Sequence, residues 1–156
     1  MSEARMRIAT PGFLVWRLSM KLRVAVDRAV APLGLTHAQY SVLASLYGMH
    51  HAGESPSQRR LADHTGLEPL YISKLARGLE SAGLVDRAPD PADSRAVRLN
   101  LTDQGRDVTA RAVVVVRDLQ ERLLAPLGGL AGERAAAFVR DLNLLLDVQL
   151  DPKEQA

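Results

Sequence analysis

Two short helical segments, joined by a turn at Gly66, lie at the centre of this sequence. The first is capped by Ser55 or Ser57 and ends at Gly66. The second begins at Pro69, which suits a first helical position, and ends near Gly83. Its predicted inward positions are Ile72, Leu75 and Leu79. Two short helices joined by a turn that contains glycine predict a helix-turn-helix.

An alternating segment follows this helix pair. Residues 84–87 and 96–101 alternate partly between apolar and polar side chains, and the polar stretch 88–95 separates them. This pattern predicts a β-hairpin with a long tip. Helix, turn, helix and hairpin, in that order, are the elements of a winged helix-turn-helix, in which the second helix enters the major groove of DNA.

Further helices flank this central part. Apolar residues recur in steps of four over 10–31, and Thr36 with Gln39 predicts a capping box for a helix that ends at a loop beginning at Gly48. Helical patterns also run from residue 102 to a break at Gly128 and over about 131–150. The predicted fold class is therefore mainly α with a small β-hairpin wing.

Composition excludes several classes of protein. The chain has 156 residues, the size of one domain, and its lack of cysteine excludes a disulfide framework, a thiolate zinc site and a cysteine nucleophile. Pro11, Gly12 and Arg17 interrupt the first apolar stretch, so it fits neither a secretory signal nor a membrane span. We expect a cytoplasmic protein.

Four motifs then occur in a fixed order. They are Gly34-Leu35-Thr36 with Gln39-Tyr40, Leu61-Ala62 with Gly66, Leu79-Glu80 leading to Gly83-Leu84-Val85 and Arg87, and Asp90-Pro91 with Asp93-Ser94-Arg95 before Leu101-Thr102-Asp103-Gln104-Gly105. In this order and spacing they resemble the MarR family of bacterial transcription regulators, from about residue 11 to residue 150. The resemblance implies a single domain over 1–156, with dimerisation helices at 10–31 and 102–150 and a DNA-binding winged helix-turn-helix lobe at 35–101.

The resemblance also implies a function. It predicts a homodimer that binds double-stranded DNA at a pseudo-palindromic operator, acting as a repressor released by a small-molecule effector. No cofactor is expected.

Candidate DNA-binding residues lie on the second helix of the motif and before the first. Lys74 and Arg77, three residues apart, can face DNA together. The resemblance adds Ser57, Leu70, Tyr71 and Ser73 to this set. Leu70 with Tyr71 predicts apolar contact with thymine methyl groups. Two structural alternatives stay open: Ser57 acts only as an N-cap, and Tyr71 only as a packing aromatic.

The hairpin tip carries Asp93 and Arg95, which match the Asp-x-Arg wing of the family. An arginine gains from the negative potential of a narrow A·T-rich minor groove, so Arg95 is expected there. Asp93 would orient Arg95 or a neighbouring arginine. The alternative is a solvated turn with a surface salt bridge.

For the effector, the family implies a small aromatic or anionic ligand in a cleft beside the DNA-binding lobe. Candidates near that cleft are Trp16, Met20, His37 and Tyr40. Trp16 and Met20 suit core or dimer packing equally well.

Three other functions have different sequence requirements. A metal-responsive regulator would need the histidines, but His50 and His51 are adjacent and are expected to be solvated loop residues. An enzyme is not expected, because no catalytic motif is present. A winged-helix module that binds protein instead of DNA stays open, because residues 55–101 carry seven basic and six acidic side chains.

Overall fold

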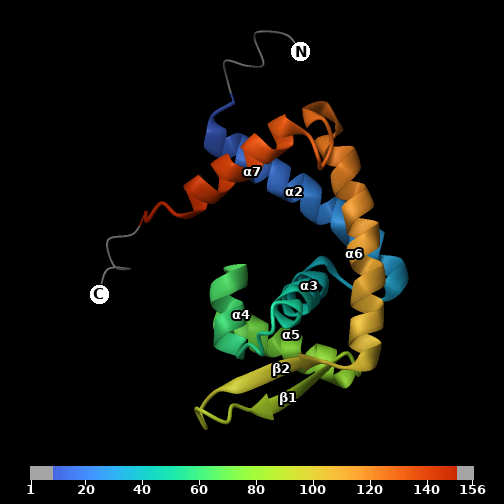
Figure 1. The fold of residues 1–156 in the computed structure, drawn as a ribbon, viewed down its shortest axis with the longest axis vertical. Helices are drawn as coiled ribbons and strands as arrows, with labels where there is room; N and C mark the ends of the chain where they lie inside the picture. The colour runs from blue at the N-terminus through green and yellow to red at the C-terminus, as the bar shows by residue number, and fades with distance from the viewer. Residues whose placement is uncertain (1–8, 151–156) are drawn as a thin grey trace. The chain divides into compact units, whose positions relative to one another are not determined.

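A computed structural model describes residues 9–150 (Figure 1). Its elements are α2 (Pro11–Val30), η1 (Ala31–Leu33), α3 (His37–His51), α4 (Gln58–Thr65), α5 (Pro69–Ser81), β1 (Val85–Pro89), β2 (Val97–Leu101), α6 (Asp103–Leu124), η2 (Ala125–Leu127) and α7 (Glu133–Leu146). The mainly α fold with one hairpin is confirmed. The chain divides within α6 into two compact units, one up to Val116 and one from Arg117. No helix of the described residues is long and apolar enough to cross a bilayer.

The start of α3 confirms the predicted capping box. The Gln39 amide donates to Thr36 Oγ1 at 3.2 Å, and the Thr36 amide donates to Gln39 Oε1 at 3.0 Å. The predicted end of this helix at Gly48 is wrong, because the helix continues to His51 and buries Met49. The helix ends at His51, and the chain turns away at Gly53, which has a φ of 80° and donates its amide to the His50 carbonyl at 3.0 Å.

The helix-turn-helix forms from α4 and α5. Ser57 Oγ accepts the Arg60 amide at 3.1 Å and so caps α4, while Gly66, at φ 71°, ends it. Helices α3, α4 and α5 contact one another, and β1 and β2 pack at their edge (Figure 1). The fully buried side chains include Leu43, Leu46, Leu61, Ile72, Leu79 and Leu99.

The hairpin pairs β1 with β2 antiparallel, from Val85 opposite Leu101 to Pro89 opposite Val97. Strand β1 runs two residues further than its predicted end, because the turn closes later, where the Asp90 amide donates to the Ala96 carbonyl at 3.0 Å. The backbone of Arg98 also forms an isolated antiparallel β-bridge with Ser57, which ties the hairpin to the start of α4.

In the second unit, η2 leads into α7. Glu121 accepts the Leu130 amide at 2.9 Å, which fixes this connection. Helix α7 ends at Leu146 and not at the predicted residue 150. All residues over 143–150 are exposed in this chain, so no packing contact holds a further turn in helical form.

Candidate DNA interface and adjoining pocket

Helix α5 has one buried and one exposed face. Ile72, Ala76 and Leu79 are buried. On the other face, Lys74 and Arg77 are exposed, and Leu70 is 86% exposed at the first turn. A large apolar side chain this exposed on a helix with two cations has no packing role within the chain. The helix therefore presents apolar and cationic groups together on one surface.

Ser73 lies on the same helix, one turn before Arg77. Arg77 Nη1 donates to Ser73 Oγ at 3.1 Å, so Ser73 directs the guanidinium along the helix surface. Ser57 is an N-cap in the structure. Its hydroxyl oxygen accepts the Arg60 amide, which leaves its own O–H available as a donor. Capping and a phosphate contact are therefore compatible at this position.

The hairpin tip is organised by two carboxylates. Asp93 Oδ1 accepts the backbone amide of Arg95 at 2.9 Å, so it fixes the backbone and not the guanidinium of that residue. The carboxylate that pairs with an arginine side chain is Asp90, whose Oδ2 lies 3.0 Å from Arg98 Nε. Hydrogen bonds from the Ala92 amide and from Arg98 hold the pKa of Asp90 below its usual value.

Sequence reasoning missed the pair of Asp90 and Arg98. Eight residues separate them, and only the strand register, which places Ala88 opposite Arg98, brings them together. Asp90 and Pro91 directly follow β1 and stand out as a turn signal, but nothing in the sequence indicates which side chain pairs with Asp90.

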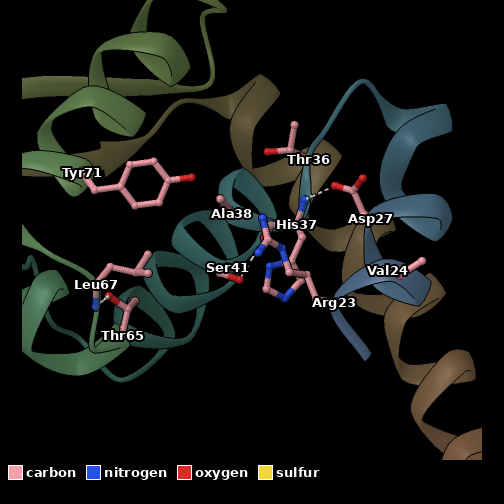
Figure 2. A pocket seen from close by; sticks show the side chains of 10 residues that line it. All are labelled: Arg23, Val24, Asp27, Thr36, His37, Ala38, Ser41, Thr65, Leu67 and Tyr71. Atoms are coloured by element: carbon pink, nitrogen blue, oxygen red, sulfur yellow. Dashed lines mark hydrogen bonds between the residues drawn. The ribbon is translucent and has the colours of Figure 1, made fainter. Parts of the chain in front are cut away.

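A pocket of about 560 Å³ lies beside α5 (Figure 2). Its lining residues are Arg23, Val24, Asp27, Thr36, His37, Ala38, Ser41, Thr65, Leu67 and Tyr71. The Tyr71 side chain points from the first turn of α5 toward α3 (Figure 2). The pocket is thus lined by α2, α3, the end of α4 and the start of the same helix that exposes Leu70.

The polar wall of this pocket is formed by Arg23, Asp27 and His37. Asp27 Oδ1 accepts the backbone amide of His37 at 2.8 Å, which joins α2 to the start of α3. Burial, together with the neighbouring Arg23 cation, lowers the pKa of His37, while Asp27 opposes this shift. The ring is therefore biased toward its neutral form, and Arg23 supplies the positive charge.

The four predicted effector residues do not come together. His37 lines the pocket, but Trp16 and Met20 line a separate hollow along α2. Tyr40 is half-buried on α3 and lines neither the pocket nor this hollow. Burial raises the pKa of Tyr40. Arg23 was missed, because the four-residue pattern of α2 indicates its apolar face and says nothing of which cation faces α3.

The prediction that the adjacent histidines are loop residues is wrong, although His51 is exposed as expected. His50 and His51 belong to the last turn of α3. Both ring nitrogens of His50 are buried without a hydrogen-bond partner, whereas His51 Nδ1 lies 2.8 Å from the Tyr47 carbonyl. Over residues 9–150, no three His, Asp or Glu side chains gather in an arrangement that could hold a metal ion.

Comparison with known proteins decides the family. Residues 33–96 match the model of the MarR family. The HTH-type transcriptional repressor Rv2887 of Mycobacterium tuberculosis is 36% identical over 118 residues, covering 74% of this chain and 81% of that protein. The chain belongs to the MarR family. As a MarR protein it is a DNA-binding transcription regulator and not an enzyme.

Two solved structures resemble this MarR protein over most of its length. The repressor CouR of Rhodococcus jostii, bound to a 23-mer DNA duplex, is 30% identical with a TM-score of 0.74, covering 88% of this chain and 92% of that one. The regulator PcaV of Streptomyces coelicolor, in complex with its natural ligand, is 29% identical with a TM-score of 0.71, covering 90% and 94%.

Proposed function

We propose that this MarR protein is a homodimeric repressor that binds a pseudo-palindromic operator and releases it when a small molecule fills the pocket beside α5. One observation carries the proposal. The first turn of α5 exposes Leu70 outward while Tyr71, the next residue, lines the pocket. The repressor Rv2887, the DNA-bound CouR and the ligand-bound PcaV support the same combination of activities in relatives.

In this proposal α5 reads the major groove. Leu70 contacts thymine methyl groups, and Lys74 and Arg77 contact base edges or phosphates. The hydroxyl of Ser57 donates to a phosphate at the start of α4, and Ser73 orients Arg77. At the hairpin tip, Arg95 enters the minor groove while Asp93 fixes its backbone.

Tyr71 has two roles in this scheme. Its side chain forms part of the pocket wall, and its position on the first turn of α5 lies beside the base-reading residues. A ligand that contacts Tyr71 therefore acts directly on the DNA-reading helix. Such a ligand releases DNA only if it binds better to the conformation that does not fit the operator.

The effector that suits this pocket is small and carries an anionic group. Arg23 offers a cation on one wall, and Thr36 offers a hydroxyl group nearby, whereas the Ser41 hydroxyl already donates to the His37 carbonyl at 2.9 Å. Tyr71 and Leu67 supply an aromatic and an apolar surface opposite. The combination fits an aromatic or otherwise flat carboxylate. Trp16, Met20 and Tyr40 are not required for this contact.

Dimerisation follows from the exposed apolar side chains of α2 and of the segment around α7. On α2 these are Phe13, Leu14, Val15, Trp16, Leu18, Met20 and Val24, and in the second unit they include Val139, Leu144, Leu145 and Leu146. Apolar exposure on this scale is typical of an interface. We assign residues 10–31 and 102–150 to dimerisation and 35–101 to DNA binding. In the DNA-bound dimer the two copies of α5 would lie about 34 to 36 Å apart, one turn of B-DNA.

The cytoplasm is the compartment we assign to the protein, because a bacterial DNA-binding regulator works where the chromosome is.

The test of the proposal is a selection of purified protein against a random duplex library, followed by fluorescence anisotropy across a range of salt concentrations. Enrichment of a palindrome, with affinity that falls steeply with salt, is expected. Binding that is weak and blind to sequence in the ligand-free protein would contradict the proposal and favour a protein-binding winged helix.

A further inference from the structure

One ion pair closes the base of the hairpin tip. Asp90 Oδ2 lies 3.0 Å from Arg98 Nε, and the side chains are only 14% and 33% exposed. The other oxygen of the same carboxylate accepts the Ala92 amide at 2.8 Å. One side chain thus holds the first turn of the tip and the opposite strand at the same time.

Arg98 connects this ion pair to the helix-turn-helix. Its backbone lies opposite Ala88 in the hairpin and also bridges to Ser57, the N-cap of α4. The next residue, Leu99, donates its amide to the Pro56 carbonyl at 3.1 Å. The ion pair therefore lies where the hairpin joins the part of the chain that begins the DNA-binding helices.

Arg95 lies inside the loop that this ion pair closes. Its backbone amide is fixed by Asp93, and the Ala96 amide donates to the Asp93 carbonyl at 3.0 Å. Among residues 9–150, the Arg95 guanidinium forms no ion pair with a carboxylate. The tip therefore has an ordered backbone and an arginine side chain that is available to a ligand.

We infer that Asp90 is a positioning residue for DNA binding, which acts through Arg98 to hold the tip in the shape that presents Arg95 to the minor groove. The inference rests on the proposed function. A carboxylate this close to DNA by itself opposes binding, because it repels phosphate. Asp90 must therefore favour binding by ordering the hairpin tip, because a tip that is already fixed loses less conformational entropy when DNA binds.

The test uses Asp90→Asn. Asparagine keeps an oxygen for the Ala92 amide, but it turns an NH₂ donor toward the Arg98 donor, so the cross-strand contact is lost. The probes are the palindrome recovered in the selection above, flanked by A·T pairs or by G·C pairs. We expect the preference for A·T flanks to fall about three- to tenfold. Affinity for the A·T probe should fall although a negative charge has been removed.

A double-mutant cycle separates positioning from general destabilisation. If Asp90 acts through Arg95, then Arg95→Ala removes the A·T preference, and adding Asp90→Asn causes no further loss. Arg98→Gln, which breaks the pair from its other side, should reduce the flank preference in the same way. Glu54→Gln is the control, because it removes a carboxylate from the exposed pair with Arg60 and should leave the preference unchanged.

Three results would overturn the inference. One is an unchanged flank preference in folded Asp90→Asn, with folding checked by thermal unfolding. The second is additive loss in the double mutant. The third is an unmodified protein that binds the palindrome without any flank preference, which removes the minor-groove contact and leaves the proposed regulator intact. Absence of palindrome binding by the unmodified protein would instead contradict the proposed function itself.

Discussion

A methyl group at Gly105 would overlap the backbone carbonyl of Leu84. This contact lies where the hairpin meets α6, and Thr102 completes it by donating its hydroxyl to the Gly83 carbonyl at 2.6 Å. Backbone cannot move aside as a flexible side chain can, so Gly105→Ala should lower the free energy of unfolding by about 1 to 3 kcal/mol. Urea unfolding measures the change.

The matched control is Gly78→Ala. Gly78 lies within α5, and an added Cβ there meets no atom within 4 Å. Alanine is the better helix former, so this variant should be more stable by about 0.5 to 1 kcal/mol. Equal effects of the two substitutions would contradict the packing assigned to Gly105.

Lys74→Ala and Arg77→Ala should weaken DNA binding in distinguishable ways. If Lys74 contacts a base edge, its loss should cost about 1 to 3 kcal/mol and relax base preference at one position of each half-site. If Arg77 contacts phosphate, its loss should weaken binding to all sequences and reduce the salt slope by about 1. Anisotropy with single-base variants of the operator measures both. Unchanged affinity in both variants would argue against α5 as the reading helix.

Arg23→Gln should raise the pKa of His37, because the Arg23 cation contributes to lowering that pKa. NMR titration of the His37 ring measures it. The same variant should weaken binding of a probe carboxylate, such as benzoate, to the pocket. Arg28→Gln is the control, since Arg28 also lies on α2 but does not line this pocket. Equal pKa changes in the two variants would contradict the assignment.

Stability should fall as the pH is lowered below about 6.5, the usual pKa of histidine. Burial lowers the pKa of His50, with Arg106 and His51 adding to the effect and the Leu99 backbone opposing it. Above the usual pKa of histidine, the His50 ring is neutral in both the folded and the unfolded state. Below it the unfolded state binds the proton first, so stability is lost as pH falls toward the folded pKa. His50→Leu should lose less stability than the unmodified protein over this range of pH in urea unfolding.

Trp16→Glu should separate the proposed dimer into monomers. Trp16 is 56% exposed in the single chain, and its ring centroid lies 6.0 Å from that of Phe13. The proposed dimer would bury this position, so a carboxylate there would disrupt an apolar interface. Sedimentation velocity measures the change. Leu70→Glu is the control: it places the same charge on an exposed apolar position of α5 and should leave the dimer intact.

The predictable parts of this fold are those set by local chemistry. The box formed by Thr36 and Gln39 involves residues three apart, so the sequence alone indicates it. Gly48 does not end α3, because a glycine can stay helical when a neighbour such as Met49 is buried, and the chain leaves the helix instead through the positive φ of Gly53. The sequence contains both glycines and does not distinguish them.

The site was predictable to the same extent. The cations of α5 and the arginine at the hairpin tip follow from position in the motif, and the structure exposes them. Contacts across elements were out of reach, because the pairing of Asp90 with Arg98 requires the strand register and the approach of Arg23 to His37 requires the packing of α2 on α3.

Tyr71 belongs both to the first turn of α5 and to the pocket wall, so under the proposed function natural selection would be unable to change DNA specificity and ligand specificity independently at this position. In the proposed regulator, a substitution at Tyr71 that admits a new metabolite would also alter the helix that we assign to DNA recognition. Lineages that acquire a new inducer while keeping their target genes would accumulate changes at Arg23, Val24 and Ser41, which line the pocket from α2 and α3. Duplicated copies that diverge at Tyr71 would be expected to change inducer and regulon together.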